Sequence, residues 1–128
     1  MTQPTIAECM TAAPYTIGDD QTLLETRKRM TKWHVRHLPV LFSGRLVGLI
    51  SDRDVDIALS ADRERTSLVS DLMIESVYVA APTEKVSHVV RTMMFRKLGA
   101  AVIAEHDKVL GVFTTTDALR LLAEKIEE

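Results

Sequence analysis

The sequence predicts a mixed α/β (α+β) fold made of two copies of one β-α-β-β-α unit. The first observation is an internal repeat, because residues 6–59 align without a gap with residues 69–122. The second is that each copy shows the same order of β-prone runs and helical periodicities. The third is the composition, since 128 residues with 46% hydrophobic and 27% charged side chains are typical of one globular domain. Identical residues recur in the two copies at Met10/Met73, Tyr15/Tyr78, Met30/Met93, Gly48/Gly111, Asp54/Asp117 and Leu59/Leu122.

The expected elements follow the same order in each copy. A β-prone segment near residues 15–17 (78–80 in the second copy) precedes a helix, which in the first copy begins at Thr22 with Glu25 at capping-box spacing. Two β-rich runs, residues 38–42 and 46–51, are joined by a turn at 43–45, and the second hairpin turns at 105–108. A closing helix begins near Asp52 in the first copy and near Thr115 in the second.

The chain is expected to be a single module, residues 1–128. Repeat one covers about residues 5–60, a short polar linker covers about 61–67, and repeat two covers about 68–124. Three short strands and two helices cannot cover their own sheet, so we expect the repeats to pack sheet to sheet with pseudo-two-fold symmetry.

The charge pattern argues against several classes of partner. The formal net charge is −2, with −1 in each half, and no basic arm suits a nucleic acid or a membrane surface. No leader and no apolar run of about 18 residues is present, so we expect a cytoplasmic protein. The single cysteine, Cys9, excludes an internal disulfide and is interpreted as a small buried hydrophobe.

Two motifs carry a family resemblance. Residues 36–40 read RHLPV and are followed by GLISDRD at residues 48–54, and GVFTTTD recurs at residues 111–117. In each case the Gly-x-x-Ser/Thr-x-x-Asp string follows an apolar strand and precedes a helix. These runs resemble those of a CBS domain, and about residues 5 to 124 resemble a tandem CBS pair, or Bateman module, that stands alone.

The resemblance implies a regulatory module that senses a ligand without catalysis. Members bind adenine nucleotides (AMP, ADP, ATP), and some bind S-adenosylmethionine or NAD(H), in clefts between the two repeats. They commonly form homodimers through their helices, which would let this chain act on an unidentified regulated protein. The alternative is a ligand-independent dimerisation or protein-interaction scaffold. No Ser-His-Asp order, metal cluster or poised general base suggests an enzyme.

Carried over by position, the resemblance gives two nucleotide-binding sites. Site one would use Met10, Tyr15, Val35, Arg36, Val112, Thr114, Thr116 and Asp117. Site two would use Met73, Tyr78, Leu98, Gly99, Leu49, Ser51, Arg53 and Asp54. The apolar members would sandwich the base, and the Gly-to-Asp motif would hold the ribose and phosphate.

The polar members of these sites allow two interpretations. Asp54 and Asp117 could accept hydrogen bonds from vicinal ribose hydroxyls, or could complement the positive end of a helix. Ser51 and Thr114 could hold phosphate oxygens, or could simply cap a helix. Arg53 could be a phosphate clamp or a solvated side chain.

The two sites are expected to be unequal. Arg36 lies three residues before Pro39, where relatives often place a phosphate ligand, whereas its counterpart Gly99 carries no charge. We therefore expect Asp117 with Arg36 to make the better site. Tyr15 and Tyr78 could equally be core or edge-strand aromatics.

Two further features are weighed against function. His34 and His37 are three residues apart, but they straddle an expected helix end and have no third ligand in register, so no metal site is expected. Arg27 occupies a position where a small apolar residue is expected, which leaves the packing of the first helix open.

Overall fold

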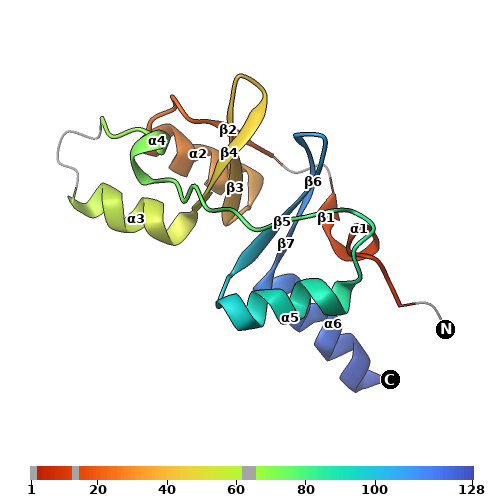
Figure 1. Cartoon of the computed structure of the whole chain (residues 1–128). Helices are drawn as coiled ribbons and strands as arrows, with labels where there is room; N and C mark the ends of the chain where they lie inside the picture. The colour runs from red at the N-terminus through yellow and green to blue at the C-terminus, as the bar shows by residue number, and fades with distance from the viewer. Residues whose placement is uncertain (1–2, 13–14, 62–65) are drawn as a thin grey trace. The chain divides into compact units, whose positions relative to one another are not determined.

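The computed structural model describes residues 3–12, 15–61 and 66–128, so part of the expected linker, residues 62–65, lies outside the described residues. The predicted mixed α/β class is confirmed (Figure 1). The described helices are α1 (Ile6–Cys9), α2 (Leu23–Trp33), α3 (Asp52–Ala61), α4 (Val69–Leu72), α5 (Val86–Arg96) and α6 (Thr115–Glu127). The described strands are β1 (Thr11–Ala12), β2 (Ile17–Gly18), β3 (His37–Phe42), β4 (Arg45–Ser51), β5 (Val79–Ala80), β6 (Ala100–Glu105) and β7 (Lys108–Thr114).

These elements form two compact units. The first unit contains residues 15–77, and the second unit contains residues 78–128 together with the N-terminal segment that carries α1 and β1. The units therefore do not coincide with the two sequence copies, because the start of each copy belongs to the unit formed by the rest of the other copy.

The first unit is built on a three-stranded sheet of order β2-β3-β4. Strand β2 is parallel to β3, and β3 is antiparallel to β4. The hairpin between β3 and β4 has a two-residue loop in which Ser43 and Gly44 have φ of 50° and 78°. Positive φ at both positions is the pattern of a type I′ turn, whose twist matches that of paired strands.

Helix α2 has the start that its sequence predicts. The Thr22 hydroxyl accepts a hydrogen bond from the backbone N–H of Glu25 at 3.1 Å, which satisfies one free donor of the first turn. The Glu25 side chain does not complete a capping box and instead accepts a hydrogen bond from Arg29. At the other end, His34 adopts left-handed backbone geometry with φ of 56°, which ends the helix and redirects the chain toward β3.

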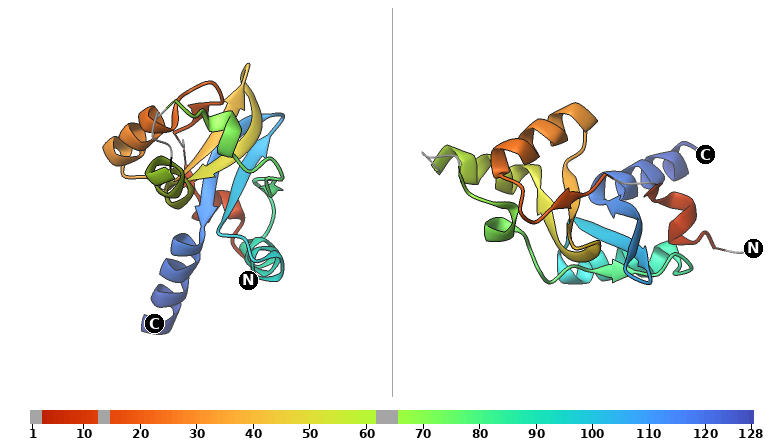
Figure 2. Two further views of the ribbon diagram at one scale, coloured as in Figure 1. Left: turned by 90° about the vertical axis from the view of Figure 1, so that its left-hand side faces the viewer. Right: turned by 90° about the horizontal axis from the view of Figure 1, so that it is seen from above.

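The second unit is built on a four-stranded sheet of order β1-β7-β6-β5. Its hairpin loop, His106 and Asp107, again has positive φ at both positions, 52° and 65°. Helix α5 ends at Lys97 with φ of 56°, as α2 ends at His34. Helix α6 follows β7 directly, and Figure 2 shows its C-terminal half running away from the sheet of its own unit.

Each sheet is extended by a segment from the other sequence copy. Thr11 in β1 pairs with Val112 in β7, and the equivalent residue Ile74 exchanges two 2.9 Å backbone hydrogen bonds with Leu49 in β4. The short helices α1 and α4, which precede these pairings, are absent from the β-α-β-β-α pattern that the sequence predicts. Helix α1 is held to the second unit by a 2.7 Å hydrogen bond from the Ile6 N–H to the Glu84 carbonyl.

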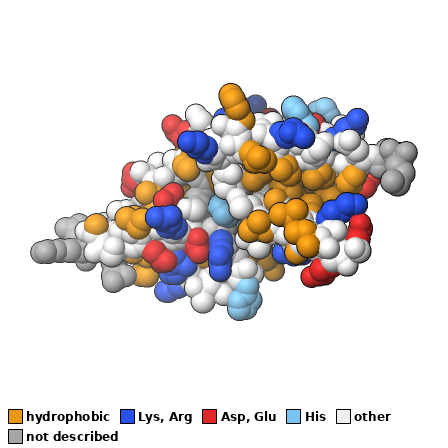
Figure 3. Space-filling view, turned by 90° about the horizontal axis from the view of Figure 1, so that it is seen from below, with side chains coloured by type: hydrophobic (Ala, Val, Ile, Leu, Met, Phe, Trp, Pro, Cys, Tyr) orange, Lys and Arg blue, Asp and Glu red, His pale blue; other side chains and the backbone are white. Residues whose placement is uncertain are grey.

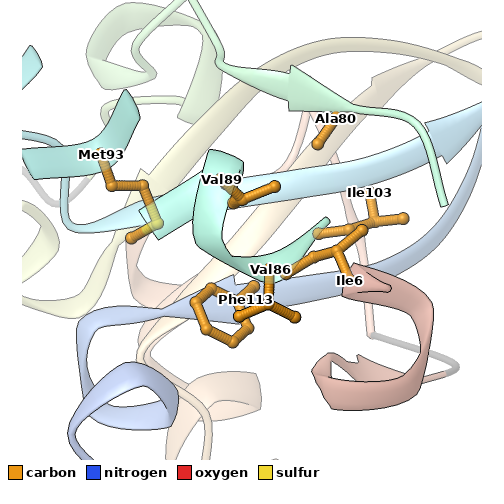
Figure 4. Close-up of a cluster of buried hydrophobic side chains, with 8 residues drawn as sticks. Ile6, Ala80, Val86, Val89, Met93, Ile103 and Phe113 are labelled. Carbon is orange, nitrogen blue, oxygen red and sulfur yellow. The ribbon is translucent and has the colours of Figure 1, made fainter. Parts of the chain in front are cut away.

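The exchanged helices supply core residues. Figure 4 shows Ile6 of α1 beside Val86 and Val89 of α5 and Phe113 of β7, and Ile6, Val89 and Phe113 are fully buried. In the first unit, Val69 of α4 is likewise fully buried in the core formed by α2, α3 and the sheet. Burial of one such side chain stabilises the fold by about 1.5–3 kcal/mol, so these segments are integral to their units.

Arg27 is accommodated in the first unit by polar contacts between α2 and α3. Arg27 on α2 donates from Nη2 to the carbonyl of Asp52 at 2.7 Å and forms an ion pair with the Asp56 carboxylate, both on α3. Its Nε is buried and has no partner in the described chain. The equivalent residue in α5 is the apolar Val90, so the α2–α3 connection has no counterpart in the second unit.

None of the helices in the described ranges combines the length and hydrophobicity needed to cross a membrane.

Candidate ligand-binding site

The Gly-to-Asp motif of the first unit lies where β4 ends and α3 begins. Ser51 closes the strand, and its Oγ accepts a hydrogen bond from the Asp54 N–H at 3.2 Å. The Asp54 side chain is half-buried, and its carboxylate accepts no hydrogen bond and forms no ion pair with any described residue. Arg53 beside it is exposed and is also unpaired within the described chain. This carboxylate is therefore available to an external donor.

In the second unit, the aspartate of the same motif is already hydrogen-bonded within the unit. Asp117 is only 5% exposed, and its Oδ2 accepts hydrogen bonds from the Thr114 N–H at 2.8 Å and from the Thr114 hydroxyl at 3.1 Å. Its Oδ1 accepts a hydrogen bond from Arg120 Nη1 at 3.1 Å. The Thr114 hydroxyl in turn lies 3.3 Å from the Asp117 N–H, which completes a capping box. Thr116 remains exposed.

The two aspartates thus occupy equivalent positions with opposite surroundings. The counterpart of Arg120 in the first unit is Ile57, which cannot pair with Asp54. A ligand hydroxyl at Asp117 would have to compete with three existing donors, whereas one at Asp54 would meet a free acceptor. The Asp54 carboxylate is thus the acceptor left free in the described chain, while the expectation that the Asp117 site is the better one stays a prediction.

Two methionines predicted for the sites lie against the glycines of the motifs. A Cβ added at Gly48 would lie 2.7 Å from the Met73 sulfur and 3.1 Å from the Ile74 carbonyl oxygen. A Cβ added at Gly111 would lie 2.7 Å from the Thr11 carbonyl oxygen and would also contact Met10. The close approach of an exchanged segment therefore requires glycine at position 111, where backbone lies within 3 Å, and crowds any larger residue at position 48.

The structure consequently brings together the motif part of each predicted site. In the second unit these residues are Met10, which lies between α1 and β1, and Val112, Thr114, Thr116 and Asp117, from β7 and α6. In the first unit they are Met73, Leu49, Ser51, Arg53 and Asp54.

The base-binding part of each predicted site lies where a helix leads into the following strand of its unit, α2 into β3 and α5 into β6. In the first unit this corner contains Tyr15, Val35 and Arg36, and the Arg36 carbonyl accepts a hydrogen bond from the Asp52 N–H at 2.8 Å. The Arg36 side chain is exposed and has no ion-pair partner in the described chain.

The equivalent corner of the second unit contains Tyr78, Leu98 and Gly99. The Gly99 carbonyl accepts hydrogen bonds from the Thr115 N–H at 3.0 Å and from its hydroxyl at 3.3 Å. Leu98 is half-buried against the core, and Gly99 is exposed. The residues expected for each site are therefore divided between the two units.

Sequence reasoning missed the partners of both tyrosines. Trp33 stacks on Tyr15 with ring centroids 4.2 Å apart and planes 5° from parallel. Arg96 lies over the Tyr78 ring, with its Cζ 5.4 Å from the centroid. Trp33 and Arg96 are 63 positions apart, as the tyrosines are. The repeat could therefore have indicated that equivalent positions contact the two tyrosines.

His37 is the titratable group most affected at the first corner. Burial lowers its pKa, the nearby carboxylates of Asp52 and Asp54 raise it, Arg36 lowers it, and the net direction is downward. The neutral imidazole is therefore favoured at neutral pH. His34 is exposed at the end of α2, while His37 lies in β3, and the described residues contain no group of three or more His, Cys, Asp or Glu that could hold a metal ion.

Two other features lie outside the predicted sites. A hollow of about 410 Å³ in the first unit is lined by β2 and by the β3–β4 hairpin, and none of its lining residues belongs to either predicted set. Cys9 is half-buried against the core of the second unit, and burial, together with Glu8 and Glu124, raises the pKa of its thiol. A raised pKa leaves little thiolate, which is unsuited to a nucleophile.

Comparison with known proteins matches this arrangement to one family. The CBS domain matches residues 6–61 and 69–124. The chain is 26% identical over 122 residues to the L-aspartate semialdehyde sulfurtransferase of Methanocaldococcus jannaschii, covering 94% of this chain and 23% of that protein. The chain spans between 23% and 38% of the length of this and the next three curated relatives.

Solved structures agree with the family match. The CBS domain pair of protein MJ0100, in complex with 5′-methylthioadenosine and S-adenosyl-L-methionine, is 25% identical with a TM-score of 0.87, and the match covers 97% of this chain and 99% of that one. CBSX2 in complex with AMP shares the fold, with a TM-score of 0.78 at 20% identity, over 97% of this chain and 98% of that one. With two matched domains, equivalent motifs in both units and these neighbours, the chain belongs to the CBS domain family as a tandem CBS pair.

Proposed function

We propose that this chain is a non-catalytic sensor of adenine nucleotides (AMP, ADP or ATP) that works as a regulatory module. The observation that carries the proposal is the free Asp54 carboxylate at the start of α3, next to a motif serine and an unpaired Arg53. A carboxylate suits vicinal ribose hydroxyls, and Arg53 is positioned in sequence to meet a phosphate. The cytoplasmic location expected from the sequence stays a prediction.

Solved neighbours support an adenosine-containing ligand. The MJ0100 pair holds 5′-methylthioadenosine and S-adenosyl-L-methionine, and CBSX2 holds AMP, so adenosine is common to all three ligands. In this chain, the tyrosine corners would receive the base, and the motif residues would receive the ribose and phosphate. Which adenosine compound binds, and whether the ligand is held between the repeats, are parts of the proposal.

Isothermal titration of the full chain with AMP, ADP, ATP, S-adenosylmethionine and NADH tests this function. We expect heat of binding with at least one adenine nucleotide, and a ligand at 100 times its Kd would stabilise the fold by about 2.7 kcal/mol. Asp54→Asn should weaken binding, while Asp71→Asn, an exposed acid that caps the short helix α4, is the control and should not. Absence of heat and of any melting shift with all five compounds would overturn the proposal.

We also propose that the module forms a homodimer through helices α5 and α6. Large apolar side chains are exposed there, and Figure 3 shows apolar atoms gathered over these two helices. On α6, Leu119, Leu122 and Ile126 are 60%, 54% and 73% exposed, at the 3–4 spacing of a helix-pairing stripe. The stripe is separate from Ala118 and Leu121, which pack on the core of the same unit.

A ligand-independent scaffold is the second candidate function. The observation that favours it is Asp117, whose carboxylate is occupied by Thr114 and Arg120 as a purely structural capping group would be. Under this alternative the apolar stripe on α6 would bind its partner equally well with or without nucleotide. Light scattering with and without the ligand identified by titration separates the two.

A further inference from the structure

Tyr15 and Tyr78 occupy equivalent positions in the two units, but chemically different side chains lie over their rings. Trp33, the last residue of α2, lies face to face with Tyr15, whereas Arg96, the last residue of α5, lies over Tyr78. The tyrosines are predicted base-binding residues in equivalent positions. A difference at their covering residue therefore bears on what each corner can bind.

Arg96 is an uncommitted cation. Its side chain is exposed and forms no ion pair with any residue in the described ranges, unlike Arg27, Arg29 and Arg120, each of which pairs with a carboxylate. A guanidinium over an aromatic ring is held through its π face, which leaves its N–H edge free for an anion. The contact with Tyr78 thus orients Arg96 without consuming its hydrogen-bonding capacity.

Two neighbours strengthen the anionic preference of this corner. Lys97 follows Arg96 and is also exposed and unpaired among the described residues. The Tyr78 hydroxyl oxygen is buried and has no hydrogen-bond partner in the described chain. A buried hydroxyl without a partner is unfavourable, so a hydrogen-bond acceptor that reached it would be favoured.

The first unit offers less positive charge at the same place. Its counterparts of Arg96 and Lys97 are Trp33 and His34, so an aromatic side chain and a histidine stand where the second unit has an arginine and a lysine. Arg36 is the remaining cation of that corner, and the carboxylates of Asp52 and Asp54 act on the adjacent His37. Stacking on the Tyr15–Trp33 pair is therefore the main interaction by which the first unit's corner would hold a base.

We propose that Arg96, held over Tyr78, is the phosphate-binding residue of the second unit's corner, which selects adenosine 5′-phosphates. The Tyr15–Trp33 corner instead selects for the base and depends little on the number of phosphates. In this arrangement Arg96 supplies the positive charge that Gly99, the counterpart of Arg36 in the second copy, cannot supply. The inference rests on the proposed function, because it assigns ligand classes to the same two corners.

The test compares adenosine with ATP by titration calorimetry, on the wild-type chain and on Arg96→Gln. We expect Arg96→Gln to weaken ATP binding about tenfold or more at one class of sites, the effect of losing a charge-assisted contact, and to leave adenosine binding within about twofold. Arg91→Gln, an exposed and unpaired α5 residue outside the corner, is the matched control and should leave both affinities unchanged.

The single tryptophan reports the other corner independently. Trp33 emission should respond to adenosine and to ATP alike, and its response should persist in Arg96→Gln. The inference is overturned if Arg96→Gln keeps the wild-type ratio of ATP to adenosine affinity, or if Arg91→Gln lowers it equally. Failure of the wild-type chain to bind either compound overturns the proposed function as well, so the two failures are distinguishable.

Discussion

At the scale of single residues, the two motif aspartates show how one sequence position serves different purposes. Asp117 is buried in a capping box and paired with Arg120, whereas Asp54 is half-buried and accepts no hydrogen bond in the described chain. The difference follows from the neighbouring side chains rather than from the motif itself, since both motifs begin with glycine and end with aspartate.

Alanine substitutions of the two aspartates should separate stability from binding. We expect Asp117→Ala to lower the free energy of unfolding by about 1–2 kcal/mol, because the Thr114 N–H loses its acceptor and the α6 start loses its cap. Asp54→Ala should change stability by less than about 0.5 kcal/mol and should abolish or strongly weaken nucleotide binding. Urea unfolding and calorimetry measure the two effects. Equal stability losses would contradict the distinction drawn here.

His37 makes stability depend on pH. Because its pKa is lowered in the folded state, the unfolded chain takes up the proton first as the pH falls. The contribution of neutral His37 is complete above the unfolded value of about 6.5 and is lost progressively as the pH falls below it toward the folded pKa. Urea midpoints measured from pH 7.5 to 5 should decline less steeply in His37→Gln. An identical slope in both proteins would show that burial of His37 does not matter.

At the scale of elements, each sheet depends on a glycine that admits an exchanged segment. Gly111 and Gly48 lie where the backbones of Thr11 and Ile74 approach the strand, and a side chain at either position would meet a carbonyl oxygen. Backbone cannot yield as a flexible side chain can, so the close approach fixes the residue type at Gly111 and disfavours larger residues at Gly48.

Gly111→Ala should therefore destabilise the second unit. The added Cβ forces Thr11 and Met10 away from β7, and overpacking of this kind costs about 1–3 kcal/mol. The melting temperature should fall accordingly. Gly99→Ala is the control, because nothing lies within 4 Å of its added Cβ and its φ is not positive, so its stability should be unchanged or slightly higher. A normal melting temperature for Gly111→Ala would contradict the proximity of β1.

The elements with strong local signals were predictable from the sequence. The starts of α2, α3 and α6 at Leu23, Asp52 and Thr115 follow from capping residues and from the end of apolar runs, and both hairpins follow from turn residues. The duplicated offset of 63 residues was enough to predict equivalent motifs in both copies.

The elements that depend on long-range partners were not predictable. Helices α1 and α4 have four residues each, too short for periodicity to identify, and they are held by contacts to distant residues such as Glu84. The partners of Tyr15 and Tyr78 come from helix ends nearly twenty residues away, and the occupation of Asp117 by Arg120 depends on the side-chain geometry of α6. Composition and spacing do not encode such contacts.

At the scale of the whole molecule, the apolar stripe on α6 predicts a homodimer that a charged substitution in the stripe should dissociate. We expect Leu122→Glu to convert a dimer to monomers, because a buried carboxylate would replace an apolar contact. Light scattering at concentrations where the wild-type chain is dimeric measures the change. Phe42→Glu introduces the same charge at a side chain of similar exposure (58%, against 54% for Leu122) on the β3–β4 hairpin, and it should remain dimeric. Dissociation in both variants would point to a different surface.

The exchanged N-terminal segment also bears on how the chain folds as it leaves the ribosome. Thr11 emerges about 100 residues earlier than its partner Val112. At about 5–20 residues per second, the segment waits roughly 5–20 seconds before its docking strand exists. During that interval Ile6 and Met10 lack the strand they pack against, so the nascent chain is vulnerable to chaperone capture or to pairing with a neighbouring polypeptide until β7 has been made.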